Sequence, residues 1–305
     1  MNLAFIQGLV AGALLSGTTL LYATLGEVVG QRSGIVNLGI EGLMLVGAAA
    51  GFAVAAETGS AVAGIVAAAI AGGLFNLLFG ILVITRGANQ LASGLAFMFF
   101  GFGLSALIGR SYVGTRIDGL DKVTLPILSD LPFFGPALFR HDPLVYLVFP
   151  VAILVWWILF RTRWGLGVRA VGEDPQVAFA AGKSPSKLRY QAIFIGGLLG
   201  GIAGAHLSLA VALIWSEFMT GGRGFIAIAL VIFAGWKPIQ AVAGALLFGG
   251  ALVLQLQMQA AGVQISPFLL EMTPFVITLV VLVAWGRSRG RSAPASLGRI
   301  YQGTE

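Results

Sequence analysis

A series of long apolar runs, separated by short polar stretches, constrains this chain more than any other feature. Only 10% of its 305 residues are charged and 58% are hydrophobic, whereas about a quarter of the residues of a soluble protein are charged. A helix needs roughly 20 residues to cross about 30 Å of hydrocarbon. Lipid also offers backbone amides no partner outside their own helix or closed sheet. The chain is therefore predicted to be an integral membrane protein.

The apolar runs predict helices rather than strands. The alternation of polar and apolar residues that a β-barrel requires is absent, so we expect an all-α polytopic protein of about nine (8–10) transmembrane helices. The 44 Gly residues predict close helix packing, because small residues let helix backbones approach in lipid. The absence of cysteine excludes disulfides and a catalytic thiol. The expected spans are 6–29, 36–56, 61–84, 90–109, 143–160, 190–213, 223–236, 238–256 and 266–285.

The basic residues predict the orientation of the chain. Six Lys and Arg lie in residues 161–189 and four in residues 287–305, out of 18 in the whole sequence. Both stretches are expected to be cytoplasmic by the positive-inside rule. Four expected spans separate them, which is consistent, and counting back through five spans places the N-terminus outside.

The same placement predicts the organisation of the chain. Residues 1–286 form a single transmembrane domain with an outer loop at 110–142 and a cytoplasmic loop at 161–189, and residues 287–305 form a basic cytoplasmic tail. The outer loop has nearly matched charges and three Pro. It is either an ordered cap or docking surface, or a simple connector.

Gly182-Lys183-Ser184 in the cytoplasmic loop has the letters that end a nucleotide-binding P-loop. A P-loop also needs a Gly five residues before its Gly-Lys and a preceding strand, but Val177 occupies that position and no strand pattern precedes it. Instead, Asp174 can cap a helix that starts at Pro175 and stops at Gly182. The expected short helix either lies on anionic headgroups as a connector or docks into a separate protein and transmits its motion.

Three blocks of the sequence, residues 30–51, 163–205 and 221–238, carry a family resemblance. RAVGEDPQVAFAAGK in the second block follows the pattern R-A-V-G-E-N-P-x-A-A-x-x-A-G-I, with Asp174 for Asn and Lys183 for an apolar residue. This pattern is similar to the coupling loop of permease subunits of bacterial ATP-binding-cassette (ABC) importers of the branched-chain amino acid, ribose and nucleoside type. The other two blocks, GQRSGIVNLGIEGLMLVGAAAG and GGRGFIAIALVIFAGWKP, resemble the nucleoside branch.

The resemblance implies an inverted-repeat permease of the cytoplasmic (inner) membrane that is not itself an enzyme. Its expected partners are an ABC ATPase subunit that binds the ATP, a second and homologous permease subunit, an extracytoplasmic substrate-binding lipoprotein, a nucleoside and the lipid bilayer. No cofactor, metal or nucleic acid is expected to bind this chain. The helix at about 174–182 would be the coupling helix that sits in a groove of the ATPase. The implied coupling residues are Gly172, Glu173, Asp174, Pro175, Ala181 and Gly182.

Two Gly-interrupted runs, RSGIVNLGIEG and GGRGFIAIA, open the second span of each set of four. Such segments at corresponding positions of two halves point to a central site in transporters. In the first run, Asn37 and Glu41 are four apart and share a face if the stretch is helical. Asn37 could offer its amide to a base or ribose and Glu41 could line or gate the path. Alternatively both are structural, with Glu41 pairing with Arg32 or capping a half-helix.

Other intramembrane polar residues also could line the substrate path, although amides in membrane helices often bond to a neighbouring helix. His206 has no His, Asp or Glu near it in sequence, so a metal or catalytic role is not expected. Phe97, Phe99, Phe100 and Phe102 could stack on a base or simply pack in lipid and core. The further candidates for the path are Asn76, Asn89, Gln90 and Ser93.

Two alternative functions remain open at this point. One is an ABC permease for simple sugars or branched-chain amino acids, because the substrate varies within the family. The other is a stand-alone ion-coupled secondary transporter, in which Glu41 would be the coupling carboxylate. A membrane enzyme is disfavoured, because the sequence shows no Ser, His and Asp set and no paired carboxylates.

Overall fold

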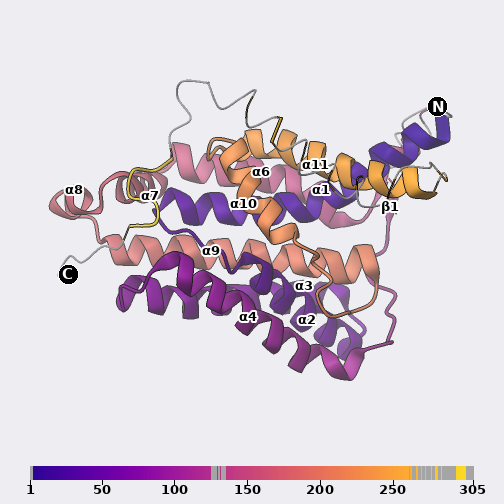
Figure 1. The fold of residues 1–305 in the computed structure, drawn as a ribbon, viewed down its shortest axis with the longest axis horizontal. Helices are drawn as coiled ribbons and strands as arrows, with labels where there is room; N and C mark the ends of the chain where they lie inside the picture. Colours follow the sequence, from indigo (N-terminus) through magenta and orange to yellow (C-terminus); the bar gives the residue numbers. More distant parts are fainter. Residues whose placement is uncertain are drawn as a thin grey trace.

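The computed structural model is an elongated helical bundle (Figure 1). It describes residues 3–124, 129, 131, 135–260 and 293–299, together with isolated positions between 262 and 283. Two short antiparallel strands, β1 (Val123–Thr124) and β2 (Arg140–His141), pair at one end. The helices are α1 (Leu3–Arg32), α2 (Ile40–Thr58), α3 (Ala61–Gly80), α4 (Gln90–Gly109), α5 (Gly135–Phe139), α6 (Pro143–Arg161), α7 (Arg163–Glu173), α8 (Pro175–Ala180), α9 (Pro185–His206), α10 (Arg223–Phe233) and α11 (Pro238–Ala260).

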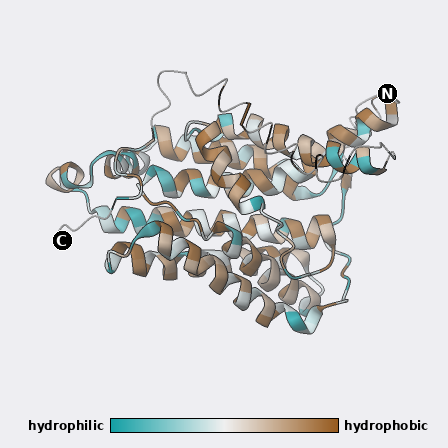
Figure 2. Cartoon of the chain, viewed as in Figure 1, coloured by the Kyte–Doolittle hydropathy of each residue, from teal (hydrophilic) through white to brown (hydrophobic). Residues whose placement is uncertain are grey.

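Seven helices of the described chain are long and apolar enough to cross a membrane, and Figure 2 shows hydrophobic residues along most of their length. α10, the expected span 223–236, is apolar but ends at Phe233. Most of the expected span 266–285 lies outside the described residues. The all-α polytopic fold is thus confirmed, while the count of about nine spans stays a prediction.

Several helices begin where side chains satisfy their first backbone amides. Asp142 accepts hydrogen bonds from the N–H groups of Leu144 and Val145 at the start of α6. The Ser184 hydroxyl accepts from the Lys187 N–H at the start of α9, and in both helices Pro follows the cap. Proline suits this position because its missing N–H would have no helical partner there. The cap at Ser184 also starts α9 at Pro185, five residues before the expected span 190–213.

α9 and α2 form the centre of the bundle, and glycine lets their neighbours approach closely. A Cβ at Gly201 of α9 would collide with the Ala68 carbonyl of α3, and one at Gly204 would collide with the Met44 carbonyl of α2. Helices at this separation gain dispersion contacts along their whole length, which drives association where lipid supplies no hydrophobic force. α2 and α3 therefore both pack closely against α9.

α2 begins at Ile40, later than the expected span 36–56, because the preceding residues are not helical. We call residues 33–39 the crossing segment. Gly34 there has a φ of 91°, which favours glycine, and the Asn37 side chain accepts a hydrogen bond of 2.7 Å from the Gly39 N–H. Such local bonds offer the backbone an alternative to helix. The premise that Asn37 and Glu41 share one helical face is therefore wrong.

The described part of the outer segment 110–142 is bonded to the bundle. The N–H groups of Ile117 and Leu120 donate to the carbonyls of Leu213 and Leu209, at and beside the π-helical end of the α9 span (η3, Leu207–Ala212). β1 and β2 then pair within the segment. These bonds hold the segment against the end of the bundle that lies opposite α8 (Figure 1).

Candidate functional site

α7 and α8 project from one end of the bundle (Figure 1). The cytoplasmic loop was expected to hold one short helix, but it holds two, because Thr162 caps α7 by accepting from the Gly165 N–H. We call residues 162–184 the coupling segment. α8 presents two apolar side chains at its surface, Val177 and Phe179, which are 64% and 44% exposed. Apolar groups exposed on a projecting helix are typical of a docking surface.

The sequence of the coupling segment explains its shape. Asp174 caps α8 by accepting from the Gln176 and Val177 N–H groups at 2.9 and 3.1 Å. Pro175 occupies the first helical position. Ala181 ends the helix, and Gly182 follows with a φ of 76°, a conformation that turns the chain toward α9. The expected helix at about 174–182 is therefore present, with no strand before it.

The last turn of α7 lies against the end of α1. A Cβ at Gly172 would collide with the Arg32 carbonyl, so only glycine allows this backbone contact. The Arg32 guanidinium in turn donates to the carbonyls of Trp236 and Gly235, just beyond α10. Glu173 is exposed and accepts a hydrogen bond from the Ala295 N–H. Thus the coupling segment touches the beginning of the crossing segment and, through Arg32, the end of α10.

Glu41 joins the beginnings of α2 and α10. Its carboxylate accepts from the Thr220 hydroxyl at 2.6 Å, from the Gly222 N–H at 2.7 Å and from the Gly224 N–H at 2.6 Å. It lies in the first turn of α2 and at the N-terminus of α10 at once. Two positive helix ends thus meet at one carboxylate.

α2 and α10 run in opposite directions from this junction. α2 ends beside the outer segment, whereas the residues after α10 contact Arg32 near the coupling segment. They are the second helices of the two sets of four, as the expected inverted repeat requires. The structure therefore brings the two Gly-interrupted runs of the sequence to one place.

Asn37 and Asn76 lie in a buried chain of amide hydrogen bonds. The Asn37 Nδ2 donates to the Asn76 Oδ1 at 2.9 Å, and the Asn76 Nδ2 donates to the Ile193 carbonyl at 2.6 Å. Both side chains are 4% exposed. These bonds fix the crossing segment to α3 and α9, and they occupy the amide groups that a substrate would need.

The remaining path candidates lie at the start of α4. Asn89 caps the helix by accepting from the Ala92 N–H, and Ser93 is buried one turn later. The buried Gln90 accepts from the Val36 N–H at 2.8 Å, and its Nε2 lies 3.4 Å from the Gly34 carbonyl. Gln90 thus ties α4 to the crossing segment.

His206 is not isolated, as its sequence neighbours suggested. Its Nδ1 lies 2.7 Å from the Thr19 hydroxyl, and its Nε2 lies 3.4 Å from the Asp142 carboxylate. Burial by itself would raise the pKa of Asp142, but the hydrogen bond and charge of His206 and the N–H groups of the α6 cap outweigh it and lower that pKa. His206 is 64 positions from Asp142 and 187 positions from Thr19 in the sequence, so no local spacing predicts this cluster. All three are buried, so they pin α1, α6 and α9 together rather than meet a substrate.

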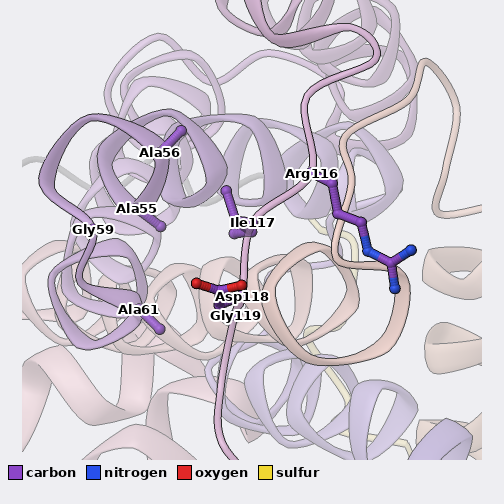
Figure 3. Close-up of a pocket in the computed structure, with 8 residues that line it drawn as sticks. All are labelled: Ala55, Ala56, Gly59, Ala61, Arg116, Ile117, Asp118 and Gly119. Carbon is purple, nitrogen blue, oxygen red and sulfur yellow. The ribbon is translucent and has the colours of Figure 1, made fainter.

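A cavity of about 260 Å³ opens at the outer end, between the α2–α3 turn and the outer segment (Figure 3). Alanines and Gly59 form one side of it, and Arg116, Ile117 and Asp118 form the other. None of the residues expected to line a substrate path borders it. This hollow therefore lies apart from the predicted substrate path, at the end of the bundle opposite α8.

These features define a helical membrane subunit with a projecting segment for docking. No group of His, Cys, Asp and Glu that could hold a metal occurs among the described residues. The crossing segment links the coupling segment to the Glu41 junction. This arrangement suits a protein in which displacement of the coupling segment moves helices within the membrane.

Comparison with known proteins agrees with this class. The chain matches the family described as branched-chain amino acid transport system / permease component over residues 9–285. It is 41% identical to a putative glucose ABC transporter permease, TsgC13, of Haloferax volcanii, over 87% of this chain and 82% of that protein. It is 33% identical to the nucleoside permease NupC of Lactococcus lactis, over 91% and 92% of the two chains. It is 32% identical to the guanosine permease NupQ of Bacillus subtilis, over 96% of each. No solved structure matches.

The chain belongs to this family of ABC transporter permeases. The family predicted from the sequence resemblance is confirmed. The predictions of a subunit that is not itself an enzyme and of a multi-pass protein of the cytoplasmic (inner) membrane are confirmed as well. Membership of an importer family implies ATPase and binding-protein partners. It also disfavours the alternative of a stand-alone secondary transporter.

Proposed function

We propose that this permease imports nucleosides, together with a second, homologous permease subunit. An extracytoplasmic lipoprotein delivers the nucleoside, and ATP-driven closure of the ATPase subunits moves the coupling segment through α8. The coupling residues are those of the motif: Gly172, Glu173, Asp174, Pro175, Ala181 and Gly182.

An exposed row of aromatic rings is the observation that carries the choice of substrate. The rings of Phe99 and Phe102 on α4 lie 5.9 Å apart, and that of Phe218 follows at 5.1 Å from Phe102. Phe99 and Phe218 are 64% and 59% exposed. Aromatic faces can stack on a heteroaromatic base.

Polar groups next to this row could bind the ribose. Glu217 and Ser105 line a small hollow with Phe102 and Phe218. The Glu217 carboxylate can accept hydrogen bonds from ribose hydroxyls or from an amino group on a base. Loose stacking and few hydrogen bonds give the weak affinity that fast release requires.

Sugar transport is the second candidate, because the relative TsgC13 is a putative glucose permease and is 41% identical. A hexose presents hydroxyls all round its ring, and its recognition calls for several side-chain hydrogen bonds. The described residues that line the hollow beside the aromatic row offer rings and aliphatic groups, with one hydroxyl and one carboxylate. This composition favours a nucleoside.

Uptake by the whole importer tests the proposal. The permease would be reconstituted in liposomes with its second permease, ATPase and binding protein, and supplied with ATP and labelled guanosine, uridine or glucose. We expect uptake of nucleosides that excess glucose does not reduce. Uptake of glucose without nucleoside uptake would establish the sugar alternative instead.

Variants of the aromatic row test the site itself. Phe99→Leu and Phe218→Leu should each raise the KM for nucleoside about tenfold, since base stacking contributes ~1–3 kcal/mol. Trp157→Leu is a matched control, because Trp157 is 52% exposed on α6, away from α4 (Figure 1). An unchanged KM in both Phe variants would contradict the assignment of this row to the substrate.

A further inference from the structure

Part of the C-terminal tail is folded into the bundle. The tail was expected to be a basic cytoplasmic extension, yet residues 294–299 lie between the coupling segment and the crossing segment. We call these residues the strap. Its Ser296 is 3% exposed, and its Leu297 packs against the hydrophobic core. A tail that only carried positive charge to the membrane surface would need no such burial.

The strap binds the end of the coupling segment. The Ser296 N–H donates to the Gly172 carbonyl at 2.9 Å, and the Ser296 hydroxyl lies 2.7 Å from the same oxygen and 3.1 Å from the Val171 carbonyl. Beside it, the Ala295 N–H donates to the Glu173 carboxylate at 3.2 Å. Every residue of the coupling segment from 171 to 173 is thus hydrogen-bonded to the strap.

The other side of the strap binds the crossing segment and α4. The Gly298 N–H donates to the Gly34 carbonyl at 3.1 Å. The Gln90 side chain of α4 donates from Nε2 to the Arg299 carbonyl at 3.3 Å, while its Oε1 accepts from the Val36 N–H. The strap therefore connects the coupling segment to both the crossing segment and α4.

The coupling segment is also bonded directly to the bundle, by Trp164 to Gln191 of α9 and by Arg169 to the Leu159 carbonyl of α6. Its direct contact with the crossing segment is of another kind. Gly172 meets the Arg32 carbonyl by backbone packing, and packing resists a push but offers little resistance to separation. Hydrogen bonds are directional and resist separation as well. A transport cycle needs movement in both directions, so drawing the crossing segment back requires a bonded link between it and the coupling segment.

We propose that the strap is this link, and that Ser296 is its positioning residue, which transmits displacement of the coupling segment to residues 33–39 and α4. The inference rests on ATP-driven import by this permease. It assigns a mechanical role to a short stretch of the tail.

Replacement of Ser296 tests the proposal in the complete importer. Ser296→Ala removes the hydroxyl that lies between the Val171 and Gly172 carbonyls and leaves the backbone bonds. Ser60→Ala is the control, because it also removes a serine hydroxyl that bonds to the backbone, but one that caps α3 at the opposite end of the bundle. Import and ATP hydrolysis would be measured on the same proteoliposomes, and the ratio of substrate imported to ATP hydrolysed compared.

We expect Ser296→Ala to lower this ratio about three- to tenfold, as the loss of one buried hydrogen bond allows, while ATP hydrolysis and the ratio in Ser60→Ala stay unchanged. Ser296→Cys, which keeps a weak donor, should restore part of the loss. A ratio in Ser296→Ala equal to that of the unmodified importer would overturn the proposal. So would equal losses of import and hydrolysis, which would show a purely structural role.

The distance between the strap and α7 provides a second readout, which does not depend on whether the Ser296→Ala variant assembles into the importer. The chain has no cysteine, so spin labels can be placed at Ala295→Cys in the strap and Leu166→Cys in α7, both at exposed positions. We expect their separation to be the same with and without ATP, because the strap moves with the coupling segment. A change on ATP binding would overturn the proposal. An unmodified importer that hydrolyses no ATP would instead refute the proposed function.

Discussion

The carboxylate of Glu41 should contribute more to stability than any other single polar group at the junction of α2 and α10. Three donors converge on it at 2.6–2.7 Å, and Thr220 and Gly224 are buried. Glu41→Ala removes the acceptor for all three, and a buried donor without a partner costs ~1–3 kcal/mol. We therefore expect a loss of about 3–6 kcal/mol in the free energy of unfolding, after some relaxation.

Glu41→Gln should have a smaller and more specific effect. The Gln oxygen can still accept from Thr220 and Gly222, but its amide nitrogen then faces the Gly224 N–H, which is also a donor. One charge-assisted bond becomes a donor–donor contact, and the charge between two positive helix ends is lost. The expected loss is about 2–3 kcal/mol.

Reversible unfolding of the purified permease in mixed detergent micelles, followed by helical circular dichroism, would measure both losses. Glu217→Gln serves as the control, because Glu217 is exposed and its replacement should leave stability unchanged. The reasoning is refuted if Glu41→Gln unfolds like the unmodified protein. A normal stability combined with altered substrate uptake would place Glu41 in the substrate path instead.

Two further predictions concern buried polar groups. Asn76→Ala removes the bonds to Asn37 and the Ile193 carbonyl and should lower the free energy of unfolding by about 1–3 kcal/mol, measured in the same micelles; an unchanged value would show that this amide is not structural. Because the pKa of Asp142 is lowered in the folded state, its contribution is complete above its unfolded pKa and is lost as pH falls through the lower, folded value. Acid unfolding monitored between about pH 2 and 6 should thus be less steep in Asp142→Asn, and identical curves would contradict this account.

Much of the fold could be predicted from local sequence signals. Apolar runs predict the spans because crossing a bilayer requires helices of that length. Helix starts are predicted by a capping residue followed by proline, since both act at the first helical turn. The chain has three such pairs, Asp142-Pro143, Asp174-Pro175 and Ser184-Pro185. The beginning of α2 escaped prediction, since the crossing segment is apolar enough to resemble a helix. Bonds from distant parts of the chain, among them those of Gln90, Asn76 and Gly298, hold it in another conformation.

The contacts of the candidate site were harder to predict, because they join residues far apart in the sequence. Glu41 meets residues about 180 positions away, and Ser296 meets Gly172 across 124 positions. Sequence spacing is informative only within one helix or strand. The family resemblance located the coupling segment, but it did not indicate what the C-terminal tail does.

The distribution of bonds indicates where movement within the bundle can occur. α2 and α10 are held together at Glu41 by three short hydrogen bonds, so their junction should move as one body. Residues 36–38 are not helical, and the side chains of Gln90 and Asn37 bond to the backbone of this stretch. Displacement that enters at Arg32 and Gly34 is therefore expected to be taken up between Gly34 and Ile40, where few backbone bonds oppose it. The Glu41 junction then acts as the pivot of the movement, and the crossing segment as its hinge.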